Sequence, residues 1–219
     1  MTLTAALVVS FRSPYSYLAT PRLHEMTRTW DLEINLRPVY PIAVRDPGFF
    51  SRNPPGWVPY LGRDTRRVAE YLGLPYGFPR PDPIVQDRET RAIAADQPYI
   101  RRITRMGVAA ARRGPRAGMD FILHVTAGMW GERVQDWHLD ANLAPMVARA
   151  GLDFAALKAE VEADPDGLDA EVQANQDALE TCGHWGVPTL AFEGEPFFGQ
   201  DRVELALWTM KKAGLQPRA

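Results

Sequence analysis

The feature that most constrains the fold is the placement of strand-like segments, which occur only near the two ends of the chain. Residues 3–11 form an almost continuous apolar run, as in a strand buried on both faces, and residues 32–40 alternate apolar and polar side chains. Strand-like segments return only at residues 189–192 and 196–198, which a Glu-Gly-Glu turn joins. The chain therefore begins β-α-β, continues through a long helical stretch, and ends β-β-α.

Helix signals fill the sequence between these strands. Ser13 and Pro14 predict the start of the first helix, because serine caps helix N-termini and proline is favoured at the first helical position. A closing helix is expected over residues 201–213, capped by Asp201, and the Pro- and Gly-rich residues 41–59 are expected to form a loop. The intervening helices are predicted at residues 64–72, 97–113, 119–130, 142–150, 153–163 and about 165–182.

A β-α-β half and a β-β-α half together make a thioredoxin-type core. We therefore predict an α/β protein, with a thioredoxin-like fold that carries a large all-helical insertion. Residues 1–45 would form the first half of the core, residues 46–182 the connecting loop and helical insertion, and residues 183–219 the second half. The inference is topological, and several other α/β folds accommodate the same order of elements.

Composition argues against several classes of protein. The net charge of −2 gives no general attraction to nucleic acid, and no apolar run approaches the ~20 residues of a membrane span. The N-terminal apolar run lacks the basic region and cleavage site of a signal peptide. Cys182 is the only cysteine, so no intramolecular disulfide can form. We expect a cytoplasmic protein without nucleic-acid or membrane partners.

Charge is unevenly distributed along the chain. Residues 88–116 contain eight arginines against two acids, and residues 153–180 contain nine acids against one lysine. One interpretation is that these stretches are two solvated helical faces. The other is that the basic stretch faces an anionic small molecule.

The turn at Ser13 is the first candidate for chemistry. A helix N-terminus offers free N–H groups and a partial positive charge, which stabilise an anion such as a thiolate. Thioredoxin-like enzymes often carry a C-x-x-C motif here. In this sequence serines, Ser13 and Ser16, occupy the two cysteine positions. The turn therefore cannot exchange dithiols. The Ser13 hydroxyl either donates to the thiolate of a ligand or serves only as the N-cap.

Two later segments are candidates for ligand binding. In a thioredoxin-like core, Pro188 would be a cis proline opposite the Ser13 turn, leaving the backbone N–H and C=O of Val187 free for a peptide-like ligand. Asp201 would either cap its helix or bind the ammonium of an amino-acid ligand, and Gln200 would bind the carboxylate. The four histidines show no metal-site spacing, so no metal is expected.

Four motifs together resemble the 2-hydroxychromene-2-carboxylate isomerase family, which is related to kappa-class glutathione transferases and DsbA-type oxidoreductases. They are SPYSYLA at 13–19, NPP at 53–55, GVPT at 186–189 and FFGQDR at 197–202. The resemblance covers nearly the whole chain, and it implies a homodimer that uses glutathione. The site residues that it implies are Ser13 at the glutathione sulfur, Asn53 near the sulfur and substrate, Val187 on the cysteinyl backbone, and Gln200 with Asp201 at the γ-glutamyl end.

The resemblance implies a glutathione-dependent isomerase of 2-hydroxychromene-2-carboxylate-like aromatic acids in aromatic catabolism, acting by reversible thiolate addition. One departure is that relatives often carry a lysine after the Asn-x-Pro-Pro stretch. Here the first lysine is Lys158, and Arg63 is no proton donor at neutral pH. The alternatives are a kappa-like glutathione transferase or peroxidase, which would consume glutathione, and a non-catalytic thioredoxin-like binding module.

An aromatic group follows the second predicted strand. Phe49, Phe50, Trp57 and Tyr60 all lie close to Asn53 in the sequence. They either form the wall of a pocket for an aromatic substrate or pack into the core.

Overall fold

The computed structural model describes residues 2–87, 89–90 and 92–218, and it contains a four-stranded sheet. The strands are β1 (Leu3–Val9), β2 (Leu32–Pro38), β3 (Thr189–Phe192) and β4 (Glu195–Phe198), in the order β2-β1-β3-β4. β1 pairs in parallel with β2 and antiparallel with β3, and β3 pairs antiparallel with β4. The predicted α/β fold, with both ends of the chain in one sheet, is confirmed.

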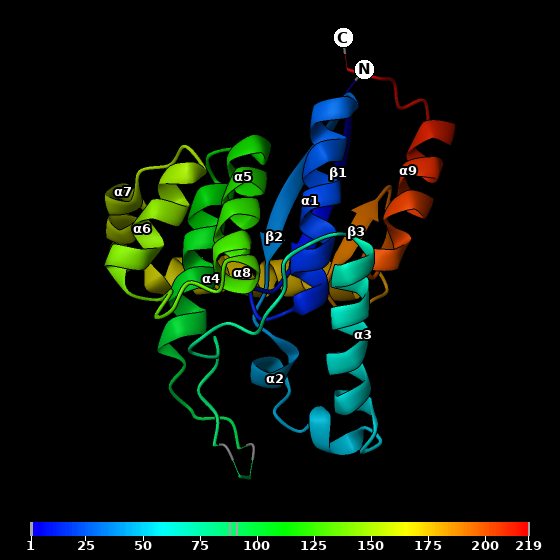
Figure 1. The fold of residues 1–219 in the computed structure, drawn as a ribbon. Coiled ribbons are helices and arrows are strands. Elements are labelled where there is room, and N and C mark those ends of the chain that lie inside the picture. The colour runs from blue at the N-terminus through cyan, green and yellow to red at the C-terminus, as the bar shows by residue number, and fades with distance from the viewer. Residues whose placement is uncertain (1, 88, 91, 219) are drawn as a thin grey trace.

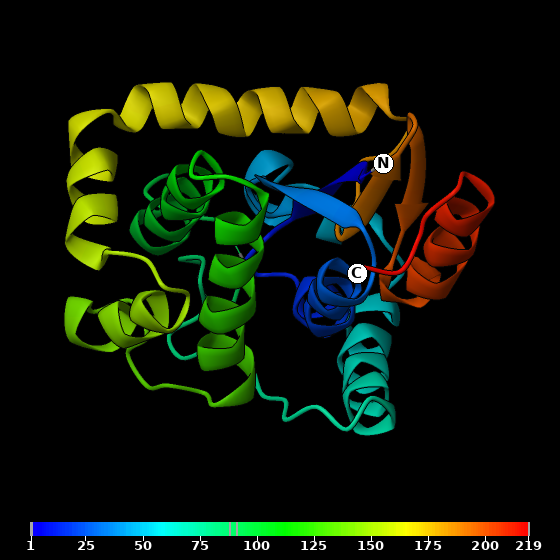
Figure 2. The ribbon, with the colours of Figure 1, turned by 90° about the horizontal axis from the view of Figure 1, so that it is seen from above.

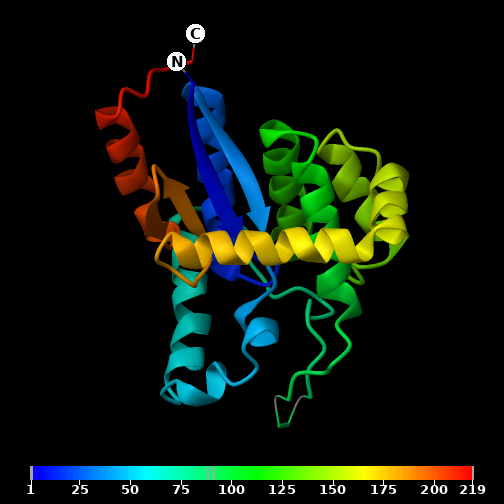
Figure 3. The same ribbon diagram turned by 180° about the vertical axis from the view of Figure 1, so that it is seen from behind.

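Helices cover both faces of this sheet. α1 (Pro14–Thr29) and α9 (Val203–Lys212) lie on one face, and α8 (Pro165–Thr181) crosses the other (Figures 1 and 2). The view from behind shows α8 running across the strands towards α4 (Pro98–Ala111), α5 (Pro115–Thr126), α6 (Asp140–Arg149) and α7 (Phe154–Ala163) (Figure 3). The helices α2 (Ile42–Arg45) and α3 (Trp57–Tyr71) follow β2, and α3 packs against α1.

The core explains why the sheet-forming runs are apolar. Leu7 and Val9 of β1 are fully buried, as are Leu18 and Leu23 of α1, and they belong to one continuous hydrophobic cluster. Burial alternates along β2, with Leu32, Ile34 and Leu36 buried. No helix in the described part of the chain is long and apolar enough to cross a bilayer.

Two predicted boundaries are wrong. Residues 41–59 are not only loop: they contain α2, a 3-10 turn at Phe50–Arg52 and the start of α3. Pro59 is compatible with α3 because the first helical N–H groups have no partner within the helix. Asp201 does not cap the last helix. It lies in a 3-10 turn, Gln200–Arg202, that precedes α9, and Arg202 stands at the cap without a side-chain hydrogen bond.

The two charged stretches face each other. Arg105 of α4 forms a bidentate pair with Asp169 of α8, and Arg112, directly after α4, binds both Glu160 of α7 and Glu171 of α8. The arginines described in this stretch therefore pair mainly with the acids of α6 to α8. They form an interface between helices, and neither of the two interpretations of the charge pattern describes this arrangement fully.

Candidate functional site

Ser13 stands at the N-terminus of α1, directly after β1. Its backbone is extended, and its Oγ accepts a hydrogen bond from Ser16 N–H at 3.2 Å, which confirms the predicted N-cap. The side chain of Ser16 is fully buried. Pro14 has no N–H and Tyr17 N–H donates to the Ser13 carbonyl at 3.2 Å, so Tyr15 N–H is the group of this turn that binds none of the described residues. Together with the helix dipole it places partial positive charge beside Ser13.

The loop before β3 lies opposite this turn. The Val187–Pro188 peptide bond is cis, and the Ser13 hydroxyl donates to the Val187 carbonyl at 3.4 Å. The Val187 N–H donates to none of the described residues. The Pro188 carbonyl accepts from Gly199 N–H at 2.9 Å, which brings the end of β4 to the same place. The Ser13 turn therefore meets a segment 174 residues later in the sequence, and the end of β4 is bound to that segment.

Gln200 and Asp201 follow Gly199 and lie beside α1. Arg22 of α1 donates from Nη2 to the Gln200 backbone carbonyl at 2.5 Å and to its side-chain Oε1 at 2.8 Å. The Gln200 amide nitrogen then remains available to donate to a ligand. Asp201 is exposed and pairs with the adjacent Arg202 at 2.9 Å. Sequence reasoning missed Arg22, which orients the Gln200 side chain.

Asn53 ends the 3-10 turn before α3, and its amide donates to the Phe49 carbonyl at 2.7 Å. The ring of Phe49 contacts Trp57 at 5.8 Å and Trp185 at 5.2 Å between centroids. Trp185 is two residues before Val187. The described contacts therefore connect Asn53 to the Ser13 region through aromatic packing and through no direct bond.

Aromatic side chains form a partly open surface beside the cis proline. Phe49, Phe50 and Trp57 contact one another, and Trp185 is 49% exposed. The His184 ring stacks on Trp185 and on Phe198, with centroids 5.4 and 4.0 Å away. These rings pack on each other, and the exposed faces of Trp185 and Phe198 leave an apolar surface that a ligand can contact.

Tyr60 is not part of this aromatic surface. It is exposed, and its hydroxyl contacts Asp64 at 3.3 Å. Tyr15 of α1 also donates to Asp64, at 2.5 Å. Burial, with the hydrogen bond to Asp64 and its charge, raises the pKa of Tyr15. The Tyr15 hydroxyl is therefore a neutral donor near neutral pH.

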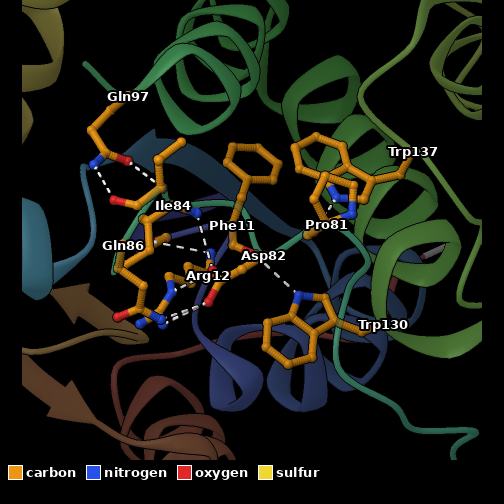
Figure 4. A network of polar contacts seen from close by, with 11 residues as sticks. Phe11, Arg12, Pro81, Asp82, Ile84, Gln86, Gln97, Trp130 and Trp137 are labelled. Carbon is orange, nitrogen blue, oxygen red and sulfur yellow. Dashed lines mark hydrogen bonds and ion pairs between the residues drawn. The ribbon is translucent and has the colours of Figure 1, made fainter. Parts of the chain in front are cut away.

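An ion pair that the sequence did not indicate holds the other side of the Ser13 turn. Arg12 donates to Asp82 through Nε at 2.8 Å and Nη2 at 3.0 Å (Figure 4). The Asp82 carboxylate also accepts from Ile84 N–H and from the Gln86 amide, each at 3.0 Å. Arg12 and Asp82 are 70 residues apart, and no local pattern marks them as partners.

Two buried tryptophans fix the same segment against the helical insertion. Trp130 donates from its indole N–H to the Phe11 carbonyl at 3.0 Å, and Trp137 donates to the Pro81 carbonyl at 2.8 Å (Figure 4). The residues on both sides of the Arg12–Asp82 pair are therefore anchored, which keeps the Ser13 turn in a defined position.

A pocket of about 370 Å³ lies elsewhere, between α4 and the start of α6. Its lining is mainly apolar and includes Tyr99, Ile103, Trp137 and Leu143. No member of the Ser13 site lines it, so it does not bear on the chemistry at Ser13. Among the described residues, no group of His, Cys, Asp and Glu side chains is arranged to hold a metal ion.

Comparison with protein families matches residues 6–208 to the DsbA-like thioredoxin domain. The chain belongs to the DsbA-like thioredoxin domain family. No curated protein matches it in sequence.

Solved structures show the same fold at low identity. A structure of 2-hydroxychromene-2-carboxylate isomerase superposes with a TM-score of 0.73 at 20% identity and covers 96% of each chain. The cytosolic disulfide reductase DsbM from Pseudomonas aeruginosa gives a TM-score of 0.61 at 17% identity, covering 97% of this chain and all of that one. The structure of DsbM with GSH gives 0.61 at 19% identity and covers 96% of this chain and 100% of that one. These likenesses establish the fold.

Within this DsbA-like domain, the turn at α1 contains no thiol. Cys182 lies at the end of α8, and its thiol contacts the Gly194 carbonyl at 3.2 Å. Burial raises the pKa of the Cys182 thiol, which keeps it protonated near neutral pH. A thiolate at Ser13 would therefore have to come from a bound ligand.

Proposed function

We propose that this protein is a glutathione-dependent isomerase of 2-hydroxychromene-2-carboxylate-like aromatic acids, in the catabolism of aromatic compounds. The observation that carries the proposal is the pairing of a serine N-cap with a cis proline: Ser13 Oγ lies 3.4 Å from the Val187 carbonyl, at a helix N-terminus without cysteine. The fold likenesses to the isomerase and to DsbM with GSH support it.

The donors and acceptors at the site fit a glutathione molecule. The free N–H and the carbonyl of Val187 suit the extended backbone of a cysteinyl residue. The Gln200 amide suits a carboxylate, and the exposed carboxylate of Asp201 suits an ammonium group. Asn53 would lie near the sulfur and the substrate, on the loop that packs against Trp185.

Glutathione, when bound, supplies a thiolate that adds reversibly to an electrophilic carbon and leaves again after the bond rearrangement, so that it is regenerated. The task of the protein is to keep that thiol ionised and in place. Ser13 would turn its hydroxyl from the Val187 carbonyl towards the sulfur, and the N-terminus of α1 would add its positive potential. The rings of Phe49, Trp57 and Trp185 would exclude water from one side.

The serine turn favours this activity over disulfide reduction. A reductase of this fold needs a reactive thiol at the start of α1, and Ser13 and Ser16 provide none. A kappa-like transferase or peroxidase is the second candidate, because no lysine follows the Asn53 loop before Lys158. We also propose a cytoplasmic homodimer, with residues 46–182 as the insertion between core halves 1–45 and 183–219.

Calorimetric titration with reduced glutathione tests the proposal first. We expect the wild type to bind, and we expect Asp201→Ala to weaken binding by roughly fivefold or more, as for a lost charge-assisted hydrogen bond. Glu162→Ala is the matched control, since it removes an exposed acid from α7, away from the site. The absence of binding by the wild type would contradict the proposal.

A turnover assay separates the two candidate activities. The protein is incubated with 2-hydroxychromene-2-carboxylate and a small amount of reduced glutathione, and both the product and the remaining thiol are measured. An isomerase converts many equivalents of substrate while the thiol concentration stays constant. A transferase or peroxidase consumes one or more thiols per product.

A further inference from the structure

Arg12, the residue directly before Ser13, has a guanidinium that is held in one orientation. Asp82 binds it in a bidentate manner, at 2.8 and 3.0 Å. The Asp82 carboxylate is itself fixed by Ile84 N–H and by the Gln86 amide. A cation fixed in this way loses little conformational entropy when it binds a further partner.

One edge of this guanidinium is open. Asp82 takes Nε and Nη2, and Nη1 binds none of the described residues. The Arg12 side chain is 16% exposed, so part of it faces solvent. Arg12 thus keeps an unused, charged N–H donor one residue from the Ser13 turn.

The same guanidinium lies over an exposed aromatic ring. The Phe78 ring has its centroid 5.9 Å from the Arg12 guanidinium carbon, and Phe78 is 46% exposed. The Phe78 ring also packs edge to face on Trp130, with centroids 5.2 Å apart. Since Trp130 is fully buried, the ring of Phe78 has a fixed support and a free surface.

We propose that Arg12 and Phe78 form the subsite for an electrophilic substrate that carries both a carboxylate and an aromatic ring. Arg12 Nη1 donates to the carboxylate, and Phe78 packs against the ring. This inference rests on the proposed function and names the residues that select its substrate. Arg12 anchors the acid and transfers no proton, because a guanidinium stays charged at neutral pH. Asp82 offsets part of its charge, so the selectivity is moderate.

The experiment compares two stable glutathione thioethers that differ in one carboxylate. Calorimetry measures binding of S-benzylglutathione and of S-(4-carboxybenzyl)glutathione. We expect the wild type to bind the carboxybenzyl compound about tenfold more tightly, as for one charge-assisted hydrogen bond. The double variant Arg12→Gln/Asp82→Asn removes both charges together, so neither is left unpaired in a half-buried place. It is expected to bind the two compounds with equal affinity, so the ratio of the two dissociation constants is the readout.

Arg63→Gln is the matched control, since Arg63 is an exposed arginine of α3 near the position where relatives carry a lysine. This variant should keep the tenfold preference. If it loses the preference, Arg63 binds the carboxylate and the assignment to Arg12 is wrong. A preference that persists in the double variant also contradicts the proposal.

Should the double variant not fold, Arg12→Lys replaces it. That side chain keeps the pair with Asp82 without the second N–H edge, so the preference should fall, and an unchanged preference overturns the assignment.

The outcomes distinguish this inference from the proposed function. If the wild type binds both thioethers equally well, the subsite is wrong and the glutathione site stands. If the wild type binds neither thioether nor reduced glutathione, the proposed function itself is wrong.

Discussion

The sheet region and the helical insertion use polar side chains in opposite ways. In the insertion, α4 and the residues directly after it meet α7 and α8 through pairs such as Arg105 with Asp169 and Arg113 with Glu160. At the carboxyl end of β1, polar groups keep free positions: Val187 N–H, the Gln200 amide and Arg12 Nη1 bind no described residue. The charged side chains at this helix interface are thus paired with one another, whereas the polar groups at the carboxyl end of β1 keep unused donors.

The comparison teaches that charge density is a poor guide to a binding site. The stretch with the most arginines carries little unused hydrogen-bonding capacity in its central part, because an acid lies opposite each guanidinium there. The site with free donors is marked instead by a serine, a valine backbone and a glutamine. Ligand binding needs groups that the fold positions and leaves unpaired.

The largest expected effect is on stability, in the insertion. Asp169 accepts from Arg105 at 2.7 Å twice and from the Tyr40 hydroxyl at 2.5 Å. Asp169→Ala leaves these donors unpaired and should lower the free energy of unfolding by about 2 kcal/mol, below the cost at a fully buried pair. Urea unfolding of the wild type and the variant measures this change in the free energy of unfolding. The control Arg116→Ala removes a 95% exposed partner of Asp120 and should change stability by less than about 0.5 kcal/mol. Equal effects of the two variants would contradict the comparison.

The ion pair between Asp169 and Arg105 also predicts that the stability of the protein depends on pH. Burial alone would raise the pKa of Asp169, but hydrogen bonds from Arg105 and Tyr40 and the nearby guanidinium charges lower it below the ordinary value. The stabilisation is therefore complete above the unfolded pKa of about 4 and is lost as the pH falls through the folded pKa. We expect the stability difference between wild type and Asp169→Asn to shrink from pH 6 to pH 3 in urea titrations. A difference that does not change with pH would exclude the ion pair as its cause.

At the site, Ser13 combines two roles that substitutions can separate. Ser13→Ala loses the cap and should cost about 1 kcal/mol of stability, and it should also raise the pKa of a bound glutathione thiol. Ser13→Asp keeps a capping oxygen but repels a thiolate, so it should raise the thiol pKa at little cost in stability. Ultraviolet absorbance of the thiolate across a pH titration measures the pKa. An unchanged thiol pKa in both variants would leave Ser13 as a cap only.

The smallest expected effect concerns Arg22, which acts through Gln200. Arg22→Leu removes the bonds to the Gln200 carbonyl and side chain, so the amide loses its fixed orientation. The affinity for reduced glutathione should fall by roughly fivefold, because the bond from the Gln200 amide to the ligand carboxylate is weakened but not removed. Arg22→Leu combined with Gln200→Leu should bind no more weakly than Gln200→Leu alone. Additive losses would show that Arg22 acts on the ligand by another route.

Local sequence signals were sufficient to predict the order of the helices and strands and the N-cap at Ser13, because helix capping and strand burial depend on neighbouring residues. They failed at Asp201, where the turn after Gly199, with a φ of 105°, displaces the carboxylate from the helix start. They could not predict the pairs Arg12–Asp82 and Arg22–Gln200, whose members are 70 and 178 residues apart. Such pairs follow from the three-dimensional arrangement and leave no spacing to detect.

Backbone amide chemical shifts during titration with reduced glutathione test the central claim most directly. The account predicts that the largest changes fall on the N–H signals of Ser13, Val187 and Gln200, while those of α4 between residues 101 and 111 stay unchanged. Changes concentrated on the arginine-bearing part of α4, or no changes anywhere, would contradict it.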